Sequence, residues 1–152
     1  MRYSSLCALV LALVVPDLSV RPLSLAQLCE GSGRVVVGSV KSIESAWNDT
    51  HTRIETTVRV EVTETLKGSA ASSVLVTVPG GTVGNVTQHV GDAPVFSAGE
   101  KVVCFLRRES ASSEVYGWFR GKFTVVGDSI REIKGQTYAG LRSSILSLCE
   151  KK

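Results

Sequence analysis

Apolar and polar residues alternate along residues 53–63 with a period of two. Every second residue from Ile54 onward is apolar or threonine, and the residues between them are charged or threonine. Successive side chains of a strand point to opposite faces, so this pattern predicts a long strand with one buried and one solvated face. We expect the strand to reach residue 66. Its buried face is expected to hold Ile54, Val58, Val60 and Val62.

Four further segments have strand patterns. Residues 34–46 form a strand whose alternation shifts around Gly38, which is typical of a β-bulge. Residues 73–78 alternate and end at Pro79, with Val74 and Val76 expected in the core. Residues 102–106 are apolar on both faces, which predicts a buried central strand that includes Phe105. Residues 115–119 and 122–126 form either a further hairpin or one broken strand.

Two segments have helical patterns. Residues 23–31 begin with Ser24 and Gln27 at the spacing of a capping box, and Gly31 is a suitable last residue. Residues 138–149 place apolar side chains on one stripe at helical spacing. The members of this stripe are Tyr138, Leu141, Ile145, Leu148 and Cys149.

The order of these elements predicts a fold of the mainly β class. About five twisted strands with a bulge in the first describe a small OB-like five-stranded barrel, with a short N-terminal helix and a C-terminal helix. A strand as long as residues 53–66 can coil so that it serves both halves of such a barrel.

The N-terminus resembles an export signal. Arg2 precedes the apolar run from Leu6 to Val15, which is too short to span a bilayer and suits a signal-peptide core. We therefore assign residues 1–22 to a signal peptide and residues 23–152 to a single domain. The cut is expected between residues 17 and 26, and a cut after Ala26 is incompatible with a helix over residues 23–31. The alternative is a buried helix at the start of the domain.

Export predicts a secreted or periplasmic protein with no membrane insertion after the signal is removed. It also changes the interpretation of the cysteines, because oxidising compartments favour disulfides. Cys7 leaves with the signal peptide, so Cys29, Cys104 and Cys149 remain. We expect these three cysteines to form one disulfide and to leave one free thiol.

Composition argues against several classes of function. The 152-residue chain carries a net charge of only +3 without long runs of one sign, and aromatic residues make up 6% of it. Both features argue against a nucleic-acid-binding surface. His51 and His89 lack the spacing of metal ligands, so we expect no metal or cofactor. A Cys104 nucleophile with His89 as its base is conceivable, but Cys104 lies in an apolar strand, and we expect no enzyme activity.

Residues 79–100 form a long connection with at most a weak strand near residues 86–90. Binding sites often lie on loops that a rigid scaffold holds, so this connection is the best candidate for a recognition surface. The alternative is that Val95 and Phe96 close the end of the barrel while the glycines only turn the chain. The candidate binding residues are Pro79, Gly80, Gly81, Val83, Asp92, Pro94, Val95 and Phe96.

Several of these segments together resemble the netrin-like domain of the tissue inhibitors of metalloproteinases. The resemblance rests on Cys29 before Val35-Val36-Val37-Gly38, on Thr65-Leu66-Lys67-Gly68 at the end of the long strand, on Gly99-Glu100 before a buried strand, and on Cys149 in a C-terminal helix. The segments Val78-Pro79-Gly80-Gly81 and Gly91–Glu100 are also similar to those of uncharacterised secreted bacterial domains. The resemblance covers most of residues 29–149.

The resemblance implies a disulfide between Cys29 and Cys149, with Cys104 as a free buried thiol. The inhibitors of this family begin with a Cys-x-Cys whose first amine and carbonyl bind the catalytic zinc of the protease. The resemblance does not imply this zinc-chelating mechanism for this chain, because it has no Cys-x-Cys. We therefore predict a non-catalytic secreted module that binds a protein partner, with a secreted protease as the suggested class of partner. The alternative is a small-ligand carrier or a small secreted enzyme of unknown chemistry.

Overall fold

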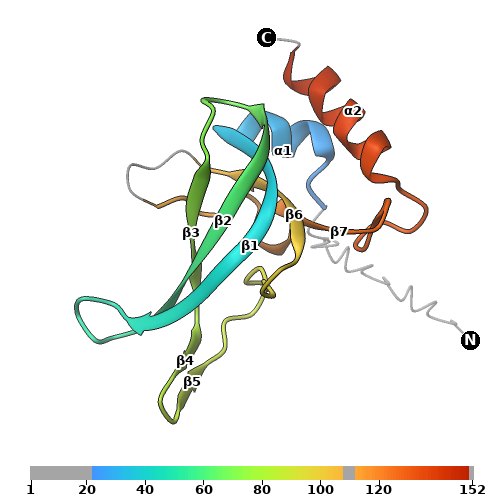
Figure 1. Cartoon of the computed structure of the whole chain (residues 1–152). Coiled ribbons are helices and arrows are strands. Elements are labelled where there is room, and N and C mark those ends of the chain that lie inside the picture. Colours follow the sequence, from blue (N-terminus) through green and yellow to red (C-terminus); the bar gives the residue numbers. More distant parts are fainter. Residues whose placement is uncertain (1–21, 108–111, 151–152) are drawn as a thin grey trace, which may run out of the picture.

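The computed structural model describes residues 22–107 and 112–150. The predicted signal peptide therefore lies outside the described residues, except for Pro22. Within the described ranges, no helix is long and apolar enough to cross a membrane. In this described part of the chain, two α-helices, one short 3-10 helix and eight strands follow one another; Figure 1 shows their arrangement.

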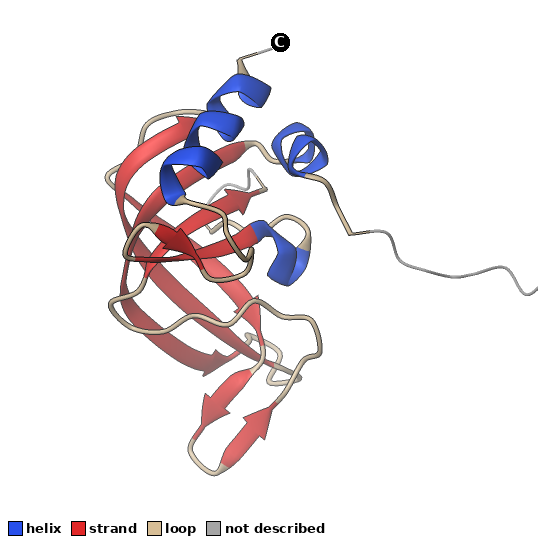
Figure 2. Ribbon diagram, turned by 90° about the vertical axis from the view of Figure 1, so that its right-hand side faces the viewer, coloured by secondary structure: helices blue, strands red, loops and turns tan. Residues whose placement is uncertain are grey.

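The strands form one large antiparallel sheet and one small hairpin. The large sheet has the order β3-β2-β1-β6-β7-β8, and β4 pairs only with β5. The β4–β5 hairpin projects from the end opposite the two helices (Figure 2). The strands are β1 (Arg34–Trp47), β2 (Ile54–Lys67), β3 (Ser73–Pro79), β4 (Gly81–Val83), β5 (Val86–Gln88), β6 (Lys101–Leu106), β7 (Lys122–Val126) and β8 (Ser129–Ile130).

The expected mainly β class is confirmed, but the expected five-stranded barrel is not found. Six strands form the sheet, and within the described residues no ladder joins its two edge strands, β3 and β8. The segment before the 3-10 helix makes only isolated bridges, from Ser113 to Val76 of β3 and from Val115 to Leu106 of β6. The expected strand over residues 115–119 is wrong, because the chain turns at Gly117 and continues as the 3-10 helix η1 (Trp118–Gly121).

The long β1–β2 hairpin dominates the sheet (Figure 1). The predicted bulge in β1 is confirmed by a register shift between Val37 and Gly38. A Cβ atom at Gly38 would lie 2.2 Å from the Glu61 carbonyl oxygen, so only glycine fits at this close approach.

Two hydrophobic cores lie on opposite sides of the sheet. One, which we call the concave core, lies on the face away from the helices and contains Val36, Val58 and Cys104. The other lies beneath the helices and contains Val35, Val37 and Phe105. The first half of β1 is therefore covered on both faces, whereas no residue from 41 to 47 is buried. The prediction that Phe105 shares a core with the β2 valines is wrong, although its burial is confirmed. Of the residues expected in the core, Ile54, Val58, Val60, Val74, Val76 and Phe105 are buried, and Val62 is half-buried.

The N-terminal helix α1 (Leu25–Gly31) has the predicted capping box between Ser24 and Gln27. It ends at Gly31 as expected, and the Tyr116 ring packs directly against this glycine, where a Cβ atom would lie 2.1 Å from the ring. Lys67 donates hydrogen bonds to the carbonyl oxygens of Cys29 and Ser32 at the end of the helix. The cation stabilises carbonyl groups that the helix leaves unpaired.

The C-terminal helix α2 (Tyr138–Cys149) has the predicted bounds, with Leu141 and Ile145 buried. It is joined to β2 by Arg142, whose Nε lies 3.0 and 2.9 Å from the two carboxylate oxygens of Glu64. The Tyr138 hydroxyl donates to the same carboxylate at 3.4 Å. These hydrogen bonds, foremost those from Arg142, hold the pKa of Glu64 below its ordinary value.

This lowered pKa predicts a loss of stability in acid. A carboxylate that is stabilised in the folded state contributes stability above its unfolded pKa of about 4.3 and loses that contribution as the pH falls through its folded pKa. A decrease in pH from about 7 to about 3 should therefore lower the melting temperature of the native protein more than that of Glu64→Gln. Thermal unfolding at a series of pH values measures both curves. Parallel pH curves for the two proteins would contradict this role of Glu64.

Candidate functional site

A buried lysine anchors the loop that was predicted to bind. The Lys122 ammonium lies 2.7 Å from the Glu100 carboxylate, with 8% and 9% of the two side chains exposed. It also donates to the Val95 carbonyl oxygen at 2.7 Å and to the Thr124 hydroxyl at 3.0 Å. All three ammonium protons therefore have acceptors, and the loop is fixed from within.

The other end of the candidate segment is the β4–β5 hairpin, which the sequence did not reveal beyond a weak strand near residues 86–90. The chain enters it through Gly80 and Gly81, whose φ angles are 92° and 138°. Gly81 passes close to β1 and β2, and a Cβ atom there would lie 2.4 Å from both the Ser45 and the Thr56 hydroxyl oxygen. These glycines therefore set the path of the chain into the hairpin.

We expect Gly81→Ala to destabilise the protein by about 1–3 kcal/mol, because it adds backbone strain and a clash. Urea unfolding measures the change. Gly91→Ala is the matched control, since a Cβ atom there meets nothing within 4 Å and its φ is not in the left-handed region. Equal stabilities of the two variants would show that the close passage at Gly81 carries no constraint.

The structure brings six of the eight candidate residues around one hollow of about 270 Å³. These six are Pro79, Gly80, Gly81, Pro94, Val95 and Phe96. Val83 and Asp92 do not line this hollow. Phe96 packs against the concave core, as the closing role requires, whereas Val95 is 75% exposed. The loop thus closes the core with Phe96 and presents Val95 to solvent.

Sequence reasoning missed two neighbours of this loop. Trp118 and Phe119 are 52% and 44% exposed. Trp118 shares a second hollow of about 370 Å³ with Pro94, and Phe119 shares another of about 270 Å³ with Pro94 and Val95. We call Val95, Trp118 and Phe119 the apolar patch. The only signal in the sequence was an aromatic pair after Gly117, which looked like part of a strand.

The patch is built on strained backbone. Trp118 has a φ angle of 58°, in the left-handed region that bulky residues rarely adopt, and Asp92 has a φ angle of 62°, which aspartate tolerates. A hydrogen bond of 3.1 Å from the Phe119 N–H to the Asp92 carbonyl oxygen joins these two segments. Strain of this kind persists only where the surrounding structure holds it, and it is enriched at functional sites.

The groups considered for catalysis lie apart in the fold. Cys104 is fully buried in the concave core, and burial raises the pKa of its thiol to about 12. Its thiolate is therefore scarce at neutral pH. His89 is exposed and lines the first hollow. Among the described residues, no group of three or more His, Cys, Asp and Glu side chains is placed to hold a metal ion.

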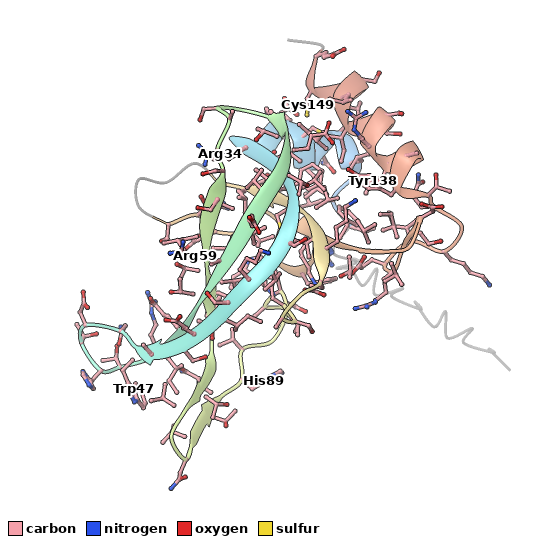
Figure 3. The ribbon with its side chains drawn as sticks, viewed as in Figure 1. Arg34, Trp47, Arg59, His89, Tyr138 and Cys149 are labelled. Carbon is pink, nitrogen blue, oxygen red and sulfur yellow. The ribbon has the colours of Figure 1, made fainter. Side chains whose placement is uncertain are left out.

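Cys29 and Cys149 meet where α1 and α2 pack together, at the opposite end of the molecule from Trp47 and His89 (Figure 3). All three described cysteines are free thiols. Burial raises the pKa of Cys29 to about 12, and the neighbouring Cys149 thiol acts in the same direction. The pairing of Cys29 with Cys149 in a disulfide stays a prediction.

Comparison with known proteins adds no identification. No protein-family model matches the sequence, and no curated protein matches it.

Proposed function

We propose that this protein is a non-catalytic, exported module that binds a protein partner through the apolar patch. The observation that carries the proposal is the exposure of Val95 on a loop that the buried Lys122–Glu100 pair fixes from within. A fixed apolar side chain loses little conformational freedom on binding, which favours affinity. Exposed aromatic side chains such as Trp118 are common at the centres of protein interfaces.

The netrin-like relationship belongs to the same proposal. It is supported by the strand order from β3 to β7 and by the bridges that bring residues 113–115 between β3 and β6. It is also supported by the Lys67 and Gly68 segment, which contacts the end of α1. This relationship suggests a secreted protease as the class of partner.

If the partner is a protease, we propose that inhibition uses the apolar patch and not an N-terminal amine. Cys29 is 3% exposed inside α1, and its carbonyl oxygen accepts a hydrogen bond from Lys67. An amine and carbonyl at this position have no access to a catalytic zinc. Acetylation of the mature N-terminus should therefore leave inhibition intact, and loss of inhibition would restore the chelating mechanism.

Two substitutions test the binding function. The native protein is used to capture partners from the secreted fraction of the host. The captured partners are purified, and their affinities for the native protein and for each variant are measured by calorimetry. We expect Val95→Asp and Trp118→Asn to weaken binding by about 30-fold or more, the effect of losing a central interface residue. Asparagine is chosen because it tolerates the left-handed backbone of Trp118.

The matched control is Val86→Asp. Val86 is also an exposed valine, at 48%, but it lies on β5 and lines none of the hollows beside the apolar patch. Val86→Asp should change the affinity for the partner by less than about threefold, as expected for a residue outside the contact. Equal losses for Val95→Asp and Val86→Asp would place the contact elsewhere.

A second candidate function is a small-ligand carrier. An apolar groove of about 500 Å³ lies between α1 and β7, and its size falls within the usual range of ligand sites. Its walls include Leu23, Leu25, Phe119 and Phe123. Calorimetric titration with dodecanoate distinguishes this candidate, because the protein-binding proposal predicts no saturable uptake of a small amphipathic ligand.

A further inference from the structure

The residues just before α1 form part of the folded domain. Ser24 caps the helix: its N–H donates to the Gln27 side chain at 2.9 Å, and its hydroxyl accepts from the Gln27 N–H at 3.2 Å. Leu23 and Leu25 pack against the core beneath the helices. A chain that lacks residues 23–26 would lose this cap and both leucines.

Leu23 also supports the turn that presents the apolar patch. A Cβ atom at Gly117 would lie 2.8 Å from Leu23 Cδ1 and 3.0 Å from Leu28 Cδ2. The two leucines therefore pack directly against the turn in which Gly117 and Trp118 are both left-handed, with φ angles of 76° and 58°. Since strained backbone persists only where its surroundings hold it, Leu23 is a positioning residue for Trp118 and Phe119.

We infer that the export signal is removed upstream of Leu23, and that residues 23–26 hold the apolar patch in its binding geometry. This inference rests on the proposed function. The step is the hydrolysis of one peptide bond by a signal peptidase; water supplies the hydroxyl of the new carboxyl group and a proton of the new amine. A cut after Ala26 would remove Leu23 and leave a helix of five residues, Gln27–Gly31, without its cap.

N-terminal sequencing of the exported protein tests the position of the cut. We expect the mature chain to begin at a residue from 18 to 23. A chain that begins at Gln27 overturns the inference, and so does an exported chain that is not cut.

A second experiment tests the positioning role without any partner. Chains that begin at Pro22 and at Gln27 are compared in a Trp47→Phe background, so that Trp118 is the only tryptophan. We expect the shorter chain to show a lower fluorescence anisotropy of Trp118 and a lower melting temperature. Equal anisotropies would overturn the inference.

If the shorter chain does not fold, point variants of the longer chain replace it. Leu23→Ala should lower the anisotropy of Trp118, whereas Leu148→Ala should not. Leu148 is the matched control because it packs against the same core from α2. Equal effects of the two variants overturn the positioning role, since general loosening of the core then explains both.

These readouts separate the inference from the function on which it rests. Sequencing and anisotropy need no partner, whereas Val95→Asp and Val86→Asp test binding. If the anisotropy responds to Leu23→Ala while no partner distinguishes the two valine variants, the binding function fails and the support of the turn stands. If binding depends on Val95 but the anisotropy is unchanged, only the inference fails.

Discussion

Lys122→Met is expected to lower the free energy of unfolding by about 3–5 kcal/mol, the usual effect of removing one partner of a buried ion pair. The change leaves the Glu100 carboxylate without its cationic partner, in a site where the Glu100 side chain is only 9% exposed. It also removes the donor for the Val95 carbonyl oxygen and the Thr124 hydroxyl. Urea unfolding at neutral pH measures the loss.

Two controls decide whether burial is the cause. Lys41 and Glu61 form an ion pair of 2.6 Å with 56% and 57% of their side chains exposed, so Lys41→Met should cost about 1 kcal/mol or less. The double variant Lys122→Met with Glu100→Gln should recover part of the stability, because no unpaired charge remains. A Lys122→Met effect no larger than that of Lys41→Met would rule out the anchoring role.

The second large effect concerns Cys29 and Cys149. Oxidation of the pair should raise the free energy of unfolding by about 4–5 kcal/mol in the chain-entropy model, because it closes a loop of roughly 120 residues. The contact between the two thiols at the α1–α2 junction supports the pairing. Unfolding of the exported protein with and without a reductant measures the gain.

Cys104→Ala is the control for this pairing. Cys104 lies in the concave core, on the other side of the sheet, so its replacement should leave the effect of the reductant unchanged. Non-reducing peptide mapping should give one linkage, between Cys29 and Cys149. A linkage that includes Cys104, or three free thiols in the exported protein, would contradict the assignment.

Local periodicity predicted the parts of the fold in which neighbouring residues set the structure. The alternation of β2 and the helical stripe of α2 each indicate a buried face without reference to the rest of the chain. The bulge at Gly38 was visible for the same reason, because the alternation shifts there. The prediction of a five-stranded barrel was wrong. Closure of a barrel depends on the direction that the chain takes after Val115, and no local periodicity in the sequence encodes that direction.

The candidate site was predicted only in part. Residues 79–96 carried the turn signals, but burial of Lys122 depends on Glu100, which lies 22 positions earlier in the chain. A lysine at the start of a strand is normally exposed, so the pair has no local signature. The left-handed backbone of Trp118 was equally hidden, since the contacts of Gly117 with Leu23 and Leu28 exist only in the folded protein.

Coverage of the first half of β1 on both faces sets the order in which the protein is expected to open. Val35, Val36 and Val37 are fully buried, so their amide protons are expected to exchange with solvent only through global unfolding. The β4–β5 hairpin has no buried strand residue and pairs with no strand of the large sheet, so its amides exchange through local opening. The protein therefore combines a slow-exchanging centre with an arm beside the apolar patch that can rearrange while the rest stays folded.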